Sequence, residues 1–177
     1  MRLLDGATAS RSLRAGIALA CLLVSGVLLL GLQPAYSAAE FTIYPGKGIG
    51  PVTLGMNVDE LRRVFGGSLS TGADQTVYTV PQQGLAVSVL YGRVTRVRTT
   101  NPSHRSEAGF GPGDQDWMRV RQGECNGGLN EASAVHDALK GFEIHCPLKG
   151  IIIEVQEGKV AGLSVVPAEA LRPGAKP

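Results

Sequence analysis

The sequence is poor in the residues that build metal and catalytic sites. It has three cysteines and three histidines, and none of them shows a C-x-x-C or H-x-x-x-H spacing. No serine lies in a G-x-S-x-G motif, and Lys47, between Gly46 and Gly48, lacks the G-K-[ST] ending of a phosphate-binding loop. We therefore expect no catalytic residue, no metal and no cofactor.

An excess of charge of one sign is also missing. The chain has 17 Lys and Arg against 15 Asp and Glu, and removal of residues 1–39 would leave 14 of each. A neutral domain has no general electrostatic attraction for nucleic acid or for an anionic membrane. We expect a protein partner and no nucleic acid.

The N-terminus has the layout of a secretory signal peptide. Three arginines, Arg2, Arg11 and Arg14, precede an apolar run without charge over residues 15–32, and small residues follow it. Cys21 lies inside this run and is read as one more apolar residue. The pattern predicts a cleaved signal over 1–39 and an exported protein, periplasmic or extracellular. The alternative is an uncleaved anchor, because 18 apolar residues are just long enough to span a bilayer.

Residues 76–99 align without a gap with residues 142–165, at an offset of 66 residues. The turn residues match: Pro81 with Pro147, Gly84 with Gly150, and Gly92 with Gly158. Apolar residues alternate with polar ones in both segments, which is typical of antiparallel strands with one buried face. Each copy therefore predicts three antiparallel strands, and the repeat predicts a duplicated unit.

A helix is expected before each set of strands. Asn57 and Glu60 form a capping-box pair at the start of an apolar stripe that ends at Gly66-Gly67. The matching helix in the second half is expected at 115–122, where Trp117 is expected to lie in the core. Residues 130–139 also have a helical pattern.

Two cysteines follow the signal segment, Cys125 and Cys146. An even number in an exported chain predicts a disulfide. Two alternatives stay open: a pair of buried free thiols, and a metal site that includes the neighbouring His145.

Part of the sequence resembles a group of small exported bacterial proteins. The segments that carry the resemblance are Gly48-Ile49-Gly50, Leu54-Gly55-Met56, Glu60-Leu61 and Gly66. They are similar to the helix-plus-sheet unit of the outer-membrane assembly lipoprotein BamE (the SmpA/OmlA type) and of the tandem-repeat β-lactamase inhibitory protein. The resemblance implies an α+β fold whose sheet face or loops bind other proteins.

These observations predict an α+β fold of two imperfect repeats, each a short helix packed on a three-stranded antiparallel sheet. The two sheets either join or lie side by side. The expected organisation is a signal peptide over 1–39, a first repeat over 40–100, a linker and helical segment over 101–129, a second repeat with an extra helix over 130–167, and a flexible tail over 168–177.

The functional expectation is a cell-envelope binding or assembly module without catalytic activity. Its candidate partner surface comprises Lys47, Arg96, Arg98, Glu154 and Gln156, together with the glycine-rich loops 45–51 and 109–113. One alternative is an inhibitor of a secreted hydrolase that inserts a loop such as 45–51. A second alternative is an enzyme that uses Cys125 or His145.

Overall fold

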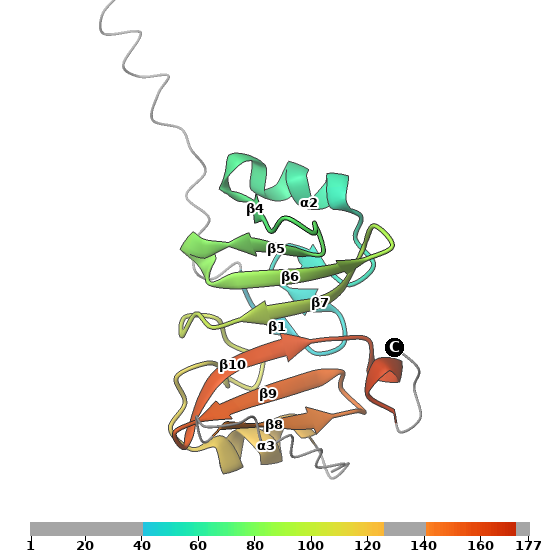
Figure 1. Ribbon diagram of the computed structural model, residues 1–177. Helices are drawn as coiled ribbons and strands as arrows, with labels where there is room; N and C mark the ends of the chain where they lie inside the picture. The colour runs from blue at the N-terminus through green and yellow to red at the C-terminus, as the bar shows by residue number, and fades with distance from the viewer. Residues whose placement is uncertain (1–40, 126–140, 173–177) are drawn as a thin grey trace, which may run out of the picture. The chain divides into compact units, whose positions relative to one another are not determined.

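The structure is a computed structural model that describes residues 41–125 and 141–172. Its main feature is a seven-stranded antiparallel sheet, in which the strand order is β4-β5-β6-β7-β10-β9-β8 (Figure 1). The strands are β4 (Ser70–Thr71), β5 (Val77–Val80), β6 (Leu85–Leu90), β7 (Arg93–Thr99), β8 (Gly141–Cys146), β9 (Ile151–Gln156) and β10 (Lys159–Val165). The join between its two halves is the pairing of β7 with β10, where Val97 lies opposite Val165 and Thr99 opposite Leu163.

Two tight turns set the strand registers. Tyr91-Gly92 joins β6 to β7 and Glu157-Gly158 joins β9 to β10, and all four residues have positive φ, at 50°, 74°, 52° and 77°. Such two-residue turns match the twist of antiparallel strands. The pairings Leu90 with Arg93 and Gln156 with Lys159 follow from these turns.

Helix α2 (Val58–Phe65) forms as its sequence predicts. The Asn57 side chain accepts a hydrogen bond from the Glu60 amide, and the Glu60 carboxylate accepts one from the Asn57 amide, both at 2.9 Å. This capping box satisfies two amides that the helix itself leaves unpaired. Leu61 and Phe65 are buried and hold the helix against the sheet.

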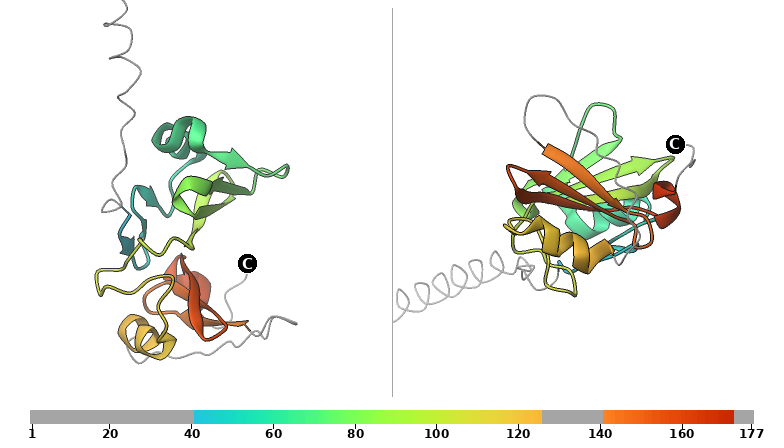
Figure 2. Two further views of the ribbon diagram at one scale, coloured as in Figure 1. Left: turned by 90° about the vertical axis from the view of Figure 1, so that its left-hand side faces the viewer. Right: turned by 90° about the horizontal axis from the view of Figure 1, so that it is seen from below.

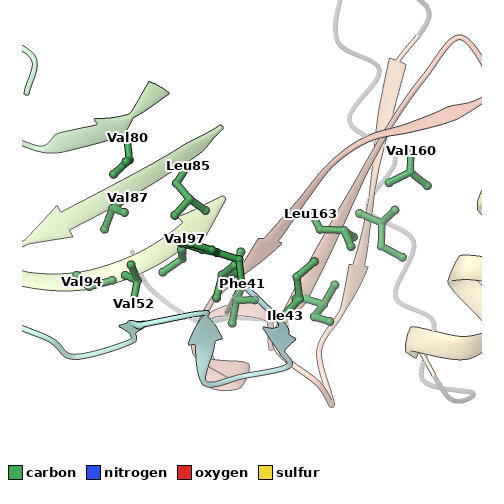
Figure 3. Close-up of a cluster of buried hydrophobic side chains, with 14 of the residues drawn as sticks. Phe41, Ile43, Val52, Val80, Leu85, Val87, Val94, Val97, Val160 and Leu163 are labelled. Carbon is green, nitrogen blue, oxygen red and sulfur yellow. The ribbon is translucent and has the colours of Figure 1, made fainter. Parts of the chain in front are cut away.

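A second, three-stranded antiparallel sheet packs on the same face as the helices (Figure 2). Its strands are β1 (Ile43–Tyr44), β2 (Gly48–Ile49) and β3 (Val52–Thr53). Gly48 is required here, because a Cβ at this position would lie 2.0 Å from the carbonyl oxygen of Val52. Phe41 and Ile43 meet Val87, Val97 and Leu163 of the large sheet in one buried cluster (Figure 3).

Helix α3 (Trp117–Cys125) lies against β8 and β9. It begins two residues later than the expected span of 115–122 and continues to Cys125. Trp117 is half-buried and contacts Phe142 edge-on, with 5.0 Å between the ring centroids. Cys125 at the end of α3 is bonded to Cys146 of β8, so the predicted disulfide is present. The bond is compatible with an oxidising, exported location.

The predicted fold class, two helix-plus-sheet repeats, is wrong. The described residues are mostly β, and the two predicted three-stranded sheets are parts of one seven-stranded sheet because β10 pairs with β7. The N-terminal half also has β4 and the three-stranded sheet, and no described strand of the second half corresponds to them. Within the described ranges, α-helix is limited to eight residues in α2 and nine in α3.

Several predictions fall outside the described residues: the signal peptide, the apolar run 15–32 and the helix over 130–139. Part of the predicted flexible tail is described, and there Ala168–Leu171 forms a short 3-10 helix. No helix within residues 41–125 and 141–172 is long and apolar enough to cross a membrane.

Candidate functional site

The candidate site is the face of the seven-stranded sheet that points away from α2, α3 and the three-stranded sheet, called here the outer face. No described element covers it (Figure 2). Strand alternation and register place one row of side chains across it. This row consists of Ala86, Arg98, Ser164, Ile152 and His145. The outer face is thus continuous across the join between β7 and β10.

An ion-pair network occupies the centre of the outer face. Nε and Nη2 of Arg98 donate to the Glu154 carboxylate, with distances of 2.7 Å from Nε to Oε1 and 2.5 Å from Nη2 to Oε2. Nη2 of Arg96 donates to Oε1 of Glu154 at 3.1 Å, and its Nε donates to the Ser164 hydroxyl at 3.0 Å. Glu143 lies 3.9 Å from Nη2 of Arg96 and 3.1 Å from Nε2 of His145. The positive charges of two arginines are therefore balanced by the negative charges of two glutamates.

Gly162 makes the central pair possible. Arg98 belongs to β7 and Glu154 to β9, so their side chains meet over the intervening strand β10. A Cβ on Gly162 would lie 2.9 Å from Oε2 of Glu154 and 3.3 Å from Nη2 of Arg98. A glycine in the middle of a strand usually weakens it. Here it leaves the space in which the ion pair forms.

The network changes the ionisation of its members. Burial by itself would raise the pKa of Glu154, but the hydrogen bond from Arg98 and the charges of Arg98 and Arg96 outweigh it and lower this pKa. The hydrogen bond to Glu154 raises the pKa of Arg98. Both groups therefore stay charged at neutral pH, and they form a fixed array of donors and acceptors.

The structure brings three of the five predicted surface residues together. Arg96, Arg98 and Glu154 form the network, and Gln156 is exposed at the end of β9. Lys47 lies elsewhere, in the turn between β1 and β2. That turn packs against the turn between β8 and β9, since a Cβ on Gly46 would lie 3.1 Å from the Lys149 carbonyl oxygen.

The predicted contact loops also differ from expectation. In the loop 45–51, Gly48 and Ile49 are buried, and Lys47 is its exposed residue. The loop 109–113 borders an open cleft of about 350 Å³. The cleft is lined by residues 108–110, 114–116, Arg119 and Val120. Its Asp114 is already paired with Arg105 at 2.6 Å, and it also accepts from the Gly111 amide.

Sequence reasoning missed Ser164 and Gly162 as parts of the site. Alternation along single strands could not show that β10 lies between β7 and β9. One signal in the sequence was available. Gly162 lies inside a predicted strand, and at the repeat offset of 66 residues it aligns with Arg96, so a glycine replaces a residue with a long side chain.

The residues of the predicted enzyme alternative lie on opposite faces of the sheet. The sulfur atoms of Cys125 and Cys146 are bonded to each other and are buried on the core side. His145 is on the outer face, next to Glu143. A reactive thiol would require reduction of the disulfide, and the sheet would still separate it from the imidazole.

Two buried ionisable side chains lie on the core side of the sheet. His104 stacks on Phe41 with 4.8 Å between the rings, and its Nδ1 lies 2.8 Å from the Thr99 hydroxyl. Burial lowers the pKa of His104 to about 4, so the ring is neutral at pH 7. Glu124 binds the Ser106 hydroxyl and lies 3.6 Å from Nζ of Lys149. Both groups have partners, as structural polar groups in a core require.

Within the described ranges, no group of three or more His, Cys, Asp or Glu is placed to hold a metal ion. The chain matches no protein-family model, no curated protein and no solved structure. Its function has to be inferred from the outer face itself.

Proposed function

We propose that this protein is an exported cell-envelope module that binds another protein through the outer face of its sheet and has no catalytic activity. The observation that supports this most directly is the ordered, charge-balanced network on a sheet face that no described element covers. Protein interfaces are enriched in arginine and carry direct hydrogen bonds between the partners.

The charge balance defines the kind of partner. A surface that attracts nucleic acid or anionic lipid needs unpaired cations, whereas Arg96 and Arg98 are both paired with Glu154. Side chains in the network remain accessible, since 37% of the Arg98 side chain is exposed. A partner would therefore meet fixed donors and acceptors, which give specificity through complementary polar groups. The resemblance to exported assembly and inhibitory proteins agrees with this role.

The test is crosslinking of the tagged protein in its own cell envelope, followed by affinity capture and mass spectrometry. Charge reversal of Arg96 or Arg98 is a poor probe, because it would also break the network. We instead choose Thr79→Arg with Gln156→Arg, which place two bulky cations on the outer face beside the network. A single stoichiometric partner, lost in this variant, is expected.

The matched control is Thr53→Arg with Ser68→Arg, two exposed positions on elements other than the large sheet. This variant carries the same added charge and should keep the partner. Loss of the partner in both variants, or retention in both, would contradict binding through the outer face.

A second candidate function is inhibition of a secreted hydrolase, and the turn between β6 and β7 favours it. Tyr91 is 95% exposed and the adjacent Leu90 is 50% exposed. Tyrosine is one of the residues most enriched at binding hot spots, where it fills a pocket of the partner. Dose-dependent inhibition of a secreted hydrolase that is lost in Tyr91→Ala would support this function. If inhibition persists in Tyr91→Ala, the turn between β6 and β7 is not the inhibitory element.

A further inference from the structure

The two edges of the large sheet differ. The edge strand β4 has only two residues, which is a common way to prevent pairing with another chain. The other edge strand, β8, has six residues, and within the described part of the chain it pairs with β9 alone. Its length and regular register leave a row of backbone groups for a further strand.

The turn after β9 identifies which backbone groups of β8 are not bonded to β9. The two-residue turn makes Gln156 and Lys159 a hydrogen-bonded pair, so the backbone of Gln156 is directed at β10. Alternation then directs Val155 at β8, and its carbonyl oxygen indeed lies 3.1 Å from a Cβ built on Gly141. Phe142 and Ile144 therefore bond to β9. Glu143 and His145 direct their amide and carbonyl groups at the open edge.

The side chains of these two residues make the edge complementary to itself. In an antiparallel pair of β8 strands centred on Ile144, Glu143 lies directly opposite His145 of the partner subunit, and this pairing occurs twice. Both residues direct their backbone groups away from β9, so each pair is also a hydrogen-bonded one. We propose that β8 pairs with β8 of a second copy of this chain, which joins two seven-stranded sheets edge to edge.

Neighbouring registers are disfavoured by the same residues. A pair centred on Glu143 places two carboxylates opposite each other, and like charges in this position are destabilising. A pair centred on His145 places Glu143 opposite Pro147 of the partner subunit, where proline has no amide to donate. The register centred on Ile144 avoids both problems, and this selects a two-fold symmetric dimer.

The experiment is sedimentation velocity on protein purified from cells that express the full chain, with its disulfide intact, from low micromolar to near-millimolar concentration. The native protein is expected to show a monomer–dimer equilibrium. His145→Glu places like charges opposite one another at both pairs, and should weaken association about tenfold. The double variant Glu143→His with His145→Glu exchanges the two residues and should restore association.

Gln156→Glu is the matched control, because it adds the same charge on the outer face one strand away from the edge. It should associate like the native protein. Fluorescence of Trp117 during urea unfolding verifies that each variant is folded. A native protein that stays monomeric throughout, a dimer that His145→Glu leaves unchanged, or an edge that captures a strand of a different protein instead would each overturn the proposal.

Discussion

Replacement of Gly162 by alanine tests how the ion-pair network is built. In an ordinary strand position this change stabilises a protein by about 0.5–1 kcal/mol, because glycine has more freedom to lose on folding. Gly162 has no unusual φ that would itself oppose the change. The added methyl group would instead lie 2.9 Å from Oε2 of Glu154 and 3.2 Å from the carbonyl oxygen of Thr99.

The two contacts respond differently. The Glu154 carboxylate ends a flexible side chain and moves aside, which breaks its two-point contact with Arg98, and a partly exposed pair of this kind contributes about 1 kcal/mol. The Thr99 carbonyl belongs to the backbone of β7, and crowding of this kind costs about 1–3 kcal/mol. After subtraction of the stabilisation of about 0.5–1 kcal/mol that the change gives at an ordinary strand position, we expect Gly162→Ala to lower the free energy of unfolding by about 1–3 kcal/mol.

Urea unfolding followed by the fluorescence of Trp117, the single tryptophan, measures this change. We expect a fall in the midpoint at constant m-value, and a melting temperature lower by about 3–9 °C. The control is Gly67→Ala, since no heavy atom lies within 4 Å of a Cβ built there. That variant should be as stable as the native protein or slightly more stable.

A double-mutant cycle with Glu154→Ala separates the two contacts. Without the carboxylate, the cost of Gly162→Ala should fall by about 1 kcal/mol, and this difference is the coupling between the two sites. The reasoning is refuted if Gly162→Ala stabilises the native protein, or if its cost is the same with and without Glu154.

Three further predictions concern stability. Reduction of the Cys125–Cys146 bond, which joins residues 21 apart, should lower the free energy of unfolding by about 3 kcal/mol, and an unchanged melting curve would contradict this. Asn57→Ala should cost about 1 kcal/mol by removing the cap of α2, and urea unfolding should show a lower midpoint. Burial lowers the pKa of His104 to about 4 in the folded protein. As the pH falls, the imidazole is therefore protonated in the unfolded chain before it is protonated in the folded one. The free energy of unfolding should be highest above pH 6.5, which is the ordinary pKa of histidine, and should fall by up to about 3 kcal/mol towards pH 4. His104→Phe should flatten that slope in unfolding measured across pH, and a slope that persists would show that other groups cause it.

Local features were predictable because they depend on neighbours in the chain. The capping box at Asn57 and the tight turn at Gly92 each form within a few residues. Alternation correctly put Arg96, Arg98 and Glu154 on the polar face of their strands. The disulfide followed from cysteine number and from the predicted export, and it is present between Cys125 and Cys146.

The fold class was not predictable in the same way. The repeat at an offset of 66 residues suggested two helix-plus-sheet units and left open whether their sheets join, because it shows which strands resemble each other and not which strands pair. The pairing of β7 with β10 joins segments far apart in the chain, and its gain is the burial of Val97, Leu163 and Val165 in a common core. The periodicity within each strand does not indicate that these two strands pair.

The sequence alone determined the capped helix, the six longer strands β5 to β10 with their polar and apolar faces, and the cysteine pair. The tertiary structure decided the strand order, and with it the site. Arg98 and Glu154 meet only because β10 lies between their strands and offers Gly162 at the crossing point. Side-chain periodicity is a property of a single strand, whereas an ion pair across three strands depends on how the whole sheet is assembled.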